Sequence, residues 1–219
     1  MFKSVLFHTD KLKLLKRFYA NVLEREIVAS TNEQFTVNIG ETDITFQQSD
    51  VPSFYHFAIN IPGNQFVIMK AWIQDRLTLN KDGGINEIYY SSLDSDSMYF
   101  EDPAGNLIEL IGRRHRDLFG DLTKEAFFDI SEVGITTPYV TQVGDDLQDF
   151  GIPLRHGTMI DPNTLNYLGK GDTFIVLTPP DWKWKFSKNK AETHPLEMTL
   201  DDGRHLALDE DGVMTFSGE

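Results

Sequence analysis

The chain has 219 residues, of which 40% are hydrophobic and 12% are aromatic, as in folded proteins with an apolar core. Its formal net charge of -14 argues against a broad nucleic-acid surface, because phosphate binding needs clustered positive charge. The sequence contains no cysteine, which excludes disulfides, thiolate metal sites and a cysteine nucleophile. The N-terminus lacks signal-peptide character and no apolar run approaches the roughly 20 residues of a membrane span, so we expect a soluble cytoplasmic protein.

The first fifty residues predict one β-α-β-β-β unit. Residues 1–9 alternate as a strand. Residues 11–23 then change to a helical period, and further strands are predicted over residues 26–30, 34–39 and 44–48. The apolar side of the predicted helix consists of Leu12, Leu15, Phe18, Tyr19, Val22 and Leu23.

The same order of elements repeats in residues 55–112. A strand over residues 55–61 ends at Pro62-Gly63, and Asn64 is the expected N-cap of a helix that runs to Leu77. Strands over residues 85–90, 97–101 and 107–112 complete the unit. Each unit alone leaves one sheet face uncovered. The repeat therefore predicts an α+β fold in which βαβββ units form curved mixed sheets around a cavity, with residues 1–112 as one domain.

Residues 113–129 are predicted to connect this domain to a degenerate third βαβββ-like unit over residues 130–219. A strand over 132–137 and a helix over 139–150 open that unit. Short strands follow, with turn sequences at 201–203 and 209–212. Trp182 and Trp184 fall in an irregular stretch after Pro179-Pro180, where proline prevents ladder pairing.

The segment Asp102-Pro103-Ala104-Gly105-Asn106 predicts a tight turn before the last strand of the second unit. Proline fixes its own φ, glycine permits a positive φ, and asparagine can bond back to the turn backbone. This turn sets the register of the strand that carries Glu109. If Glu109 faces the cavity, its carboxylate lies among apolar side chains and needs a cation, a metal or a donor-rich ligand. The alternative is that Glu109 faces solvent at a strand edge.

Three segments resemble the vicinal oxygen chelate superfamily, which includes glyoxalase I, bleomycin- and fosfomycin-resistance proteins and extradiol dioxygenases. Residues 98–110, Met-Tyr-Phe-Glu-Asp-Pro-Ala-Gly-Asn-Leu-Ile-Glu-Leu, resemble its closing hairpin. Residues 17–23, Arg-Phe-Tyr-Ala-Asn-Val-Leu, are similar to its first helix, and residues 55–61, Tyr-His-Phe-Ala-Ile-Asn-Ile, to its central strand. The resemblance covers residues 1–112 well and residues 130–219 in outline, and fold kinship alone does not fix a reaction.

The resemblance implies a divalent metal held by His56 and Glu109. An imidazole and a carboxylate with open positions suit Fe(II), Mn(II), Zn(II) or Ni(II), whereas a lone histidine on an apolar strand is more commonly a core or surface residue. Metal-binding members supply another histidine fourteen residues before the Phe-Tyr of the first helix, and this chain has Ser4 there. His8 lies about 13 Å further along that strand. In the third unit, Val133 and Gly134 occupy the comparable strand start, so no third ligand is expected there.

Two functions follow from this incomplete ligand set. The first, which we favour, is a metal-dependent enzyme, either a lyase or isomerase of the glyoxalase type or an extradiol dioxygenase. His56 and Glu109 would hold the metal, and His8, Tyr90 and Tyr99 would contact substrate or move protons.

The second is a metal-free small-molecule-binding protein of the antibiotic-resistance type. Aromatic side chains build apolar pockets, and the walls of this cavity are expected to be Phe46, Phe57, Tyr90 and Phe100. In either case the expected partner is a small molecule, and a homodimer remains open. A third possibility is that the third unit covers the first domain and the chain acts through a protein partner.

Overall fold

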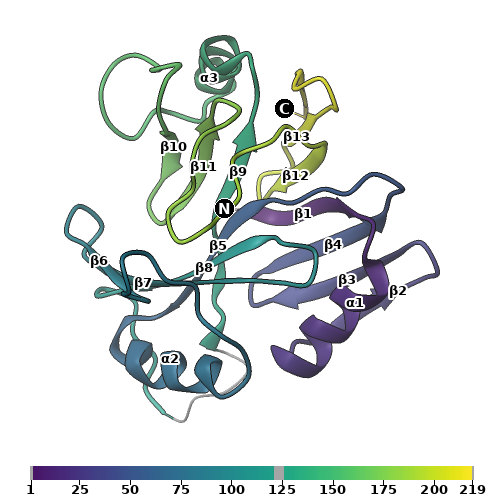
Figure 1. Ribbon diagram of the computed structural model, residues 1–219. Helices are drawn as coiled ribbons and strands as arrows, with labels where there is room; N and C mark the ends of the chain where they lie inside the picture. The colour runs from purple at the N-terminus through teal and green to yellow at the C-terminus, as the bar shows by residue number, and fades with distance from the viewer. Residues whose placement is uncertain (1, 121–125, 219) are drawn as a thin grey trace.

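The structure, a computed structural model, describes residues 2–120 and 126–218. These residues form two seven-stranded mixed sheets with helices packed beside them (Figure 1). The α+β fold of repeated βαβββ units is therefore confirmed. Within these residues, no helix has the length and apolar character needed to cross a membrane.

The first unit follows the predicted order, but its helix changes form halfway. The α-helical turns give way at Phe18 to a π-helical turn, and the apolar side of both segments is buried. The elements are β1 (Phe2–Thr9), α1 (Leu12–Arg17), η1 (Phe18–Val22), β2 (Ile27–Ser30), β3 (Gln34–Ile39) and β4 (Thr42–Gln48).

The second unit contains the expected elements, although the predicted helix cap is wrong. Asn64 binds the backbone of Leu118 instead, accepting from its N–H at 3.1 Å and donating to its carbonyl at 3.1 Å. A 3-10 turn therefore precedes the helix. The elements are β5 (His56–Pro62), η2 (Gly63–Gln65), α2 (Phe66–Gln74), β6 (Ile88–Tyr90), β7 (Ser95–Glu101) and β8 (Leu107–Arg113).

The remaining chain forms a further β-α-β-β segment and a three-stranded meander. The two predicted turns join the meander, with Gly203 and Gly212 at φ +88° and +81°. The elements are β9 (Asp129–Thr136), α3 (Val140–Asp149), β10 (Asn166–Lys170), β11 (Thr173–Thr178), β12 (Leu196–Leu200), β13 (His205–Leu208) and β14 (Met214–Ser217). The part of the predicted connector at 121–125 lies outside the described residues.

Each sheet joins strands from both sides of residues 113–129. One sheet has the order β14-β13-β12-β1-β4-β3-β2, and the other has the order β10-β11-β9-β5-β8-β7-β6. β1 pairs antiparallel with β12, and β5 pairs antiparallel with β9 (Figure 1). The second unit therefore shares its sheet with residues 129–178, and the first unit shares its sheet with residues 196–217.

The main core covers only one face of β5. Phe57, Ile59 and Ile61 point into this core and are fully buried, with the Phe7 ring stacked 5.3 Å from that of Phe57. The other face of the sheet carries a smaller apolar cluster that includes Tyr99, Leu107, Val176, Trp184 and Phe186. This second face carries His56 and holds the candidate site.

Candidate metal centre

The predicted turn at residues 102–106 is built around the Asp102 carboxylate. Its Oδ1 accepts the backbone N–H groups of Ala104 at 2.9 Å and Asn106 at 3.1 Å, and its Oδ2 accepts the Asn106 side-chain amide at 2.8 Å. The hydroxyl of Tyr19 on the first helix donates to the same Oδ2 at 3.2 Å. A buried carboxylate with four donors fixes the turn in one conformation.

The turn also locks β8 against β5. The Asn106 side-chain oxygen accepts the backbone N–H of Tyr55 at 2.8 Å, and the Leu107 N–H donates to the Tyr55 carbonyl at 2.8 Å. In the resulting parallel register, Glu109 lies opposite Ala58. Neighbours in register share a face of the sheet, so Glu109 lies on the same face as His56, two residues before Ala58.

Three buried side chains meet on this face: His56, Glu109 and Glu132. The His56 Nε2 atom lies 3.8 Å from a carboxylate oxygen of Glu109 and 3.9 Å from one of Glu132. One ligand atom from each residue lies within 4.8 Å of the others. The three side chains are 4%, 6% and 4% exposed, respectively. They form the candidate metal centre.

The imidazole of His56 is held in the orientation that metal coordination needs. Its Nδ1 lies 3.2 Å from the Leu107 carbonyl, and this contact requires the proton on Nδ1 and leaves the Nε2 lone pair toward the carboxylates. Trp184 packs against the ring at a centroid distance of 4.6 Å. Burial lowers the pKa of His56 to about 4, so this histidine is neutral at physiological pH.

Within the part of the chain that the structure describes, neither carboxylate forms an ion pair with a lysine or an arginine. Burial, followed by the charge of nearby Glu109, raises the pKa of Glu132 to about 8, and burial also raises the pKa of Glu109. Throughout the described residues, no lysine or arginine nitrogen lies within 4.0 Å of either carboxylate. Two buried carboxylates beside a neutral imidazole are costly unless a cation joins them. One nitrogen and several oxygen donors fit a divalent metal ion.

A local two-fold relation between β5 and β9 explains the composition of the cluster. Phe57 pairs with Val133 in the antiparallel register, so the residues just before them, His56 and Glu132, are equivalent. In the third unit, Val176 on β11 lies opposite Gly134, and this position is equivalent to that of Glu109 opposite Ala58. The two units thus supply three ionisable groups and one valine at four related positions.

The third unit therefore brings one group that could hold a metal, the Glu132 carboxylate, to His56 and Glu109, where the sequence led us to expect none. Glu132 directly precedes Val133 and Gly134, so the position comparable to His56 lies one residue earlier in the chain than predicted. The signal was Glu132 itself, a carboxylate in the strand Asp129–Thr136, whose eight residues are all buried. An acid in such a strand needs a partner, and the antiparallel pairing with β5 supplies one.

Of the other predicted residues, Tyr90 and Tyr99 lie at this site. Both line a cavity of about 360 Å³ together with the metal-centre residues, and their hydroxyl oxygens are 3.0 Å apart. Burial raises the pKa of Tyr90 to about 12 and that of Tyr99 well above its usual value, with the charge of Glu109 adding to both. Both tyrosines are therefore protonated donors at neutral pH.

The structure does not bring the remaining candidates to the cavity. His8 and Ser4 lie on β1 in the other sheet. The ring walls expected from Phe46, Phe57 and Phe100 are wrong, because these side chains are buried in the main core. Apart from Tyr90 and Tyr99, the aromatic residues that line the cavity are Tyr167, Trp182 and Trp184.

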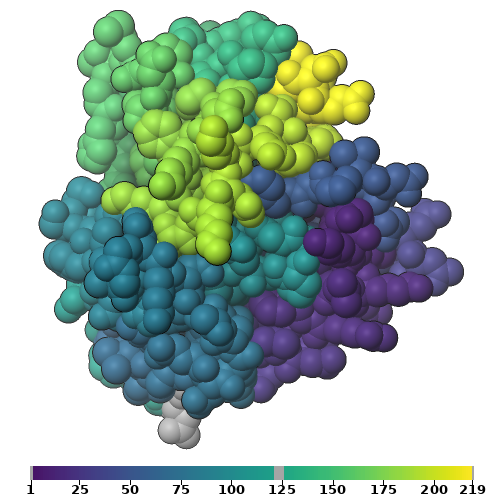
Figure 2. Space-filling model, in the orientation of Figure 1, coloured from purple at the N-terminus to yellow at the C-terminus, as the bar shows by residue number. Residues whose placement is uncertain are grey.

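One wall of the cavity is an irregular segment, residues 181–191, which we call the strap. It doubles back on itself through backbone hydrogen bonds of 2.8 Å between Asp181 and Ala191 and between Ala191 and Trp182. In Figure 2 the yellow-green chain that includes it lies across the face of the molecule, against the blue residues of the second unit. Its Phe186 ring stacks on Tyr99 at 4.6 Å and 7°.

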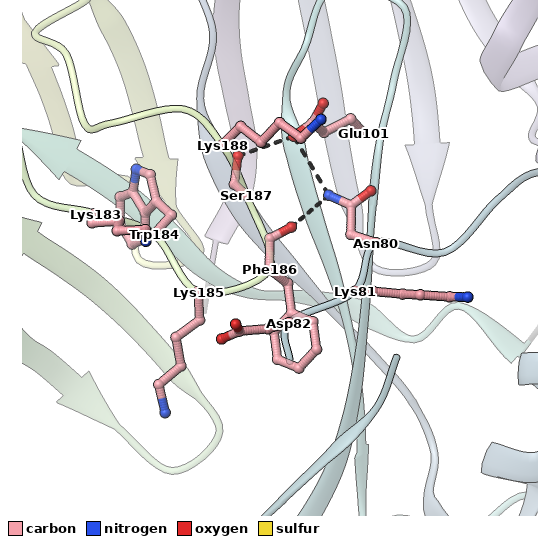
Figure 3. Close-up of a pocket in the computed structure, with 10 residues that line it drawn as sticks. All are labelled: Asn80, Lys81, Asp82, Glu101, Lys183, Trp184, Lys185, Phe186, Ser187 and Lys188. Carbon is pink, nitrogen blue, oxygen red and sulfur yellow. Dashed lines mark hydrogen bonds between the residues drawn. The ribbon is translucent and has the colours of Figure 1, made fainter. Parts of the chain in front are cut away.

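Two hydrogen bonds hold the strap against the second unit (Figure 3). The Asn80 amide donates to the Phe186 carbonyl at 2.7 Å, and the Ser187 hydroxyl donates to Glu101 at 3.0 Å. A neighbouring cavity of about 570 Å³, also lined by the strap, contains these contacts. The strap thus separates two cavities. Its polar contacts to Asn80 and Glu101 lie in the second cavity, whereas Trp184 packs on His56 in the first.

Comparisons with known proteins are consistent with this fold. The family model of the toxoflavin-degrading enzyme matches residues 130–181. A candidate dioxygenase from Bacillus subtilis has a TM-score of 0.62 and 12% identity, with 98% of this chain and 83% of that chain covered. A glyoxalase I variant from Zea mays has a TM-score of 0.58 and 12% identity, with 98% and 92% covered. No significant match was found among curated proteins. Such similarity establishes a common fold and leaves the reaction open.

Proposed function

Starting from a chain that has the vicinal oxygen chelate fold, we propose that this protein is a metal-dependent enzyme acting on a small molecule with neighbouring oxygen atoms. The observation that carries the proposal is the buried cluster of His56, Glu109 and Glu132. The cluster opens into a cavity of about 360 Å³, a size that suits a small organic molecule.

The donor set favours Mn(II) or Fe(II). One imidazole and two carboxylates form an oxygen-rich site, and no thiolate is present in the chain to select a softer ion. A metal bound here would polarise substrate oxygen atoms as a Lewis acid. His56, oriented by the Leu107 carbonyl, would supply the nitrogen ligand, and Glu109 and Glu132 would supply the oxygen ligands from two different units.

The residues around the centre support proton transfer beside it. The protonated hydroxyl groups of Tyr90 and Tyr99 contact each other. One hydroxyl can therefore donate its proton to a substrate oxygen while its own oxygen accepts a hydrogen bond from the other hydroxyl. Trp184 packs on His56 and is buried, which keeps bulk water from the nitrogen ligand. Such a centre could serve a lyase or isomerase reaction or an oxygen-dependent ring cleavage. The two differ in whether substrate turnover takes up O₂.

Metal analysis tests the proposal most directly. The purified protein is incubated separately with Mn(II), Fe(II), Zn(II) and Ni(II), freed of excess ion, and measured for bound metal. We expect about one equivalent of Mn(II) or Fe(II), and less than about a tenth of that after Glu132→Gln or Glu109→Gln, because removing a ligand weakens binding and geometry together.

The matched control is Glu197→Gln, which alters an exposed acid on β12 of the other sheet and should leave the metal content unchanged. A wild-type protein that takes up none of the four ions would refute the metal-dependent enzyme. If that protein still bound aromatic compounds, the metal-free binding function would replace it.

A further inference from the structure

We infer that the substrate of this cavity is an aromatic anion whose negative group is bound by Arg155 and Lys185. The inference rests on the proposed function for the location of the reacting centre, and it adds the chemical class of the substrate. Arg155 lies between α3 and β10, and Lys185 lies on the strap, so the two cations reach the cavity from separate segments.

The charge of the cavity is opposite to that of the whole chain. The protein has a net charge of -14, yet Arg155, Lys183 and Lys185 line this cavity, and Glu109 and Glu132 are the acids among the described residues that line it. A divalent cation on these two carboxylates would cancel their charge. The three basic side chains would then remain as an excess of positive charge, which concentrates anions in a cleft with apolar walls.

None of these three cations is committed to an ion pair. Over the whole described chain, no carboxylate oxygen lies within 4.0 Å of Arg155, Lys183 or Lys185. On the same strap, by contrast, Lys190 lies 3.0 Å from Asp181. In a protein this acidic, unpaired cations gathered in one cavity indicate a binding function for them.

Arg155 and Lys185 are held in place by aromatic rings, which leaves their donors available. The Arg155 guanidinium lies 4.7 Å from the Phe174 ring centroid, and its one protein hydrogen bond among the described residues goes to the Ser92 carbonyl at 3.4 Å. The Lys185 ammonium lies 5.4 Å from the Tyr90 ring. A guanidinium has five N–H donors and can bind a carboxylate through two of them.

Both cations line the same cavity as His56, Glu109 and Glu132. Arg155 is half-buried and Lys185 is exposed, whereas the centre is buried. A ligand that contacts both cations therefore extends from the centre toward solvent.

The aromatic walls select a flat molecule. Tyr90, Tyr99, Tyr167, Trp182 and Trp184 all line the cavity, and such rings stack or make edge contacts with a planar ligand. Trp184 and its neighbours Lys183 and Lys185 also line the second cavity of Figure 3. The strap therefore brings ring surface and positive charge to the ligand in a single segment.

Two probes with the same ring and the same neighbouring hydroxyl groups separate charge from shape: 3,4-dihydroxybenzoate and its neutral amide, 3,4-dihydroxybenzamide. Their dissociation constants are measured by quenching of tryptophan fluorescence, with and without added Mn(II). We expect the anion to bind about tenfold more tightly than the amide, which corresponds to one charge-assisted contact.

Arg155→Gln and Lys185→Gln should each reduce this preference to about threefold or less while leaving the affinity for the amide within about twofold. Lys190→Gln, a change on the strap at a lysine that does not line the cavity, should retain the tenfold preference. Equal binding of the two probes, binding of neither probe, or an undiminished preference in both variants would overturn the inference.

The outcome separates this inference from the proposed function. A protein that takes up no metal but prefers the anion through Arg155 and Lys185 refutes the metal-dependent enzyme and leaves the anion site standing. Stoichiometric metal uptake with equal affinity for the two probes supports the metal-dependent enzyme and refutes the anion site. Circular dichroism of each variant establishes that a lost preference does not reflect unfolding.

Discussion

Glu132 on β9 occupies, in the third unit, the position that His56 occupies on β5 in the second. The register Phe57–Val133 places each of them one residue before the pairing point, and both point toward Glu109. Two units that differ in sequence thus contribute to one centre through the same location in their strands. This relation, more than the identity of any single residue, predicts how the centre responds to substitution.

The first prediction concerns ligand exchange at the related position. Glu132→His places an imidazole at the position in the third unit that corresponds to His56, which is already a histidine. The centre should therefore still take up about one metal ion. Imidazole favours Zn(II) and Ni(II) over Mn(II) relative to carboxylate, and we expect the preference to shift toward these ions by about tenfold. Competition between Mn(II) and Zn(II) measures the shift; a metal content as low as that of Glu132→Gln would contradict the two-fold relation.

The second prediction concerns the fourth position. Val176→Glu adds a carboxylate at the location equivalent to Glu109 and should tighten Mn(II) binding by about tenfold, because affinity rises with the charge and number of oxygen ligands. Val176→Gln serves as the control, because glutamine has nearly the same size as glutamate but carries no charge. Titration with Mn(II) measures the affinity of both variants, and equal affinities would show that position 176 does not face the ion.

The third prediction concerns the turn that sets the register of Glu109. Asp102→Ala leaves the Tyr19 hydroxyl and the Asn106 amide without their acceptor and should lower the free energy of unfolding by about 2–4 kcal/mol. Glu26→Ala removes an exposed carboxylate just before β2 and should change the free energy of unfolding by less than about 0.5 kcal/mol. Urea denaturation compares the two, and a loss below about 1 kcal/mol for Asp102→Ala would show that the turn holds without this carboxylate.

The fourth prediction concerns stability at high pH. Burial raises the pKa of Tyr55 from 10.0 to about 12, so the folded chain keeps a proton that the unfolded chain loses. The native state then binds more protons above about pH 10, and its stability falls as the pH rises. In Tyr55→Phe the loss between pH 10 and 11.5 should be less steep by up to about 1.4 kcal/mol per pH unit. Urea denaturation at several pH values measures this slope, and parallel curves for the two proteins would contradict the raised pKa.

Local chemistry made part of the site predictable. The turn at 102–106 depends on its own residues, so its sequence predicted the register of Glu109, and the strand that begins at His56 was recognised from its alternation. Sheet pairing between distant segments leaves no comparable local signal. The sequence therefore pointed to position 4 for a third ligand, although Ser4 belongs to the other sheet, and it did not indicate Glu132.

Irregular structure hid the rest. Arg155 and Lys185 lie outside helices and strands, where no periodicity indicates which way a side chain points. In the sequence, the basic and aromatic residues of the strap form an irregular stretch between Pro179-Pro180 and the next predicted strand, with no pattern that indicates a cavity. Their common cavity depends on the strap crossing the second unit, which contacts between Asn80 and Phe186 maintain.

Val176 leaves the centre one protein donor short of its two-fold pattern. Three of the four related positions carry His56, Glu109 and Glu132, and the fourth carries a buried hydrocarbon side chain. A cation bound at the centre would find no protein donor at this fourth position, and a small molecule could supply the missing one. This single valine therefore marks the difference between a site that the protein closes by itself and one that stays open to a substrate.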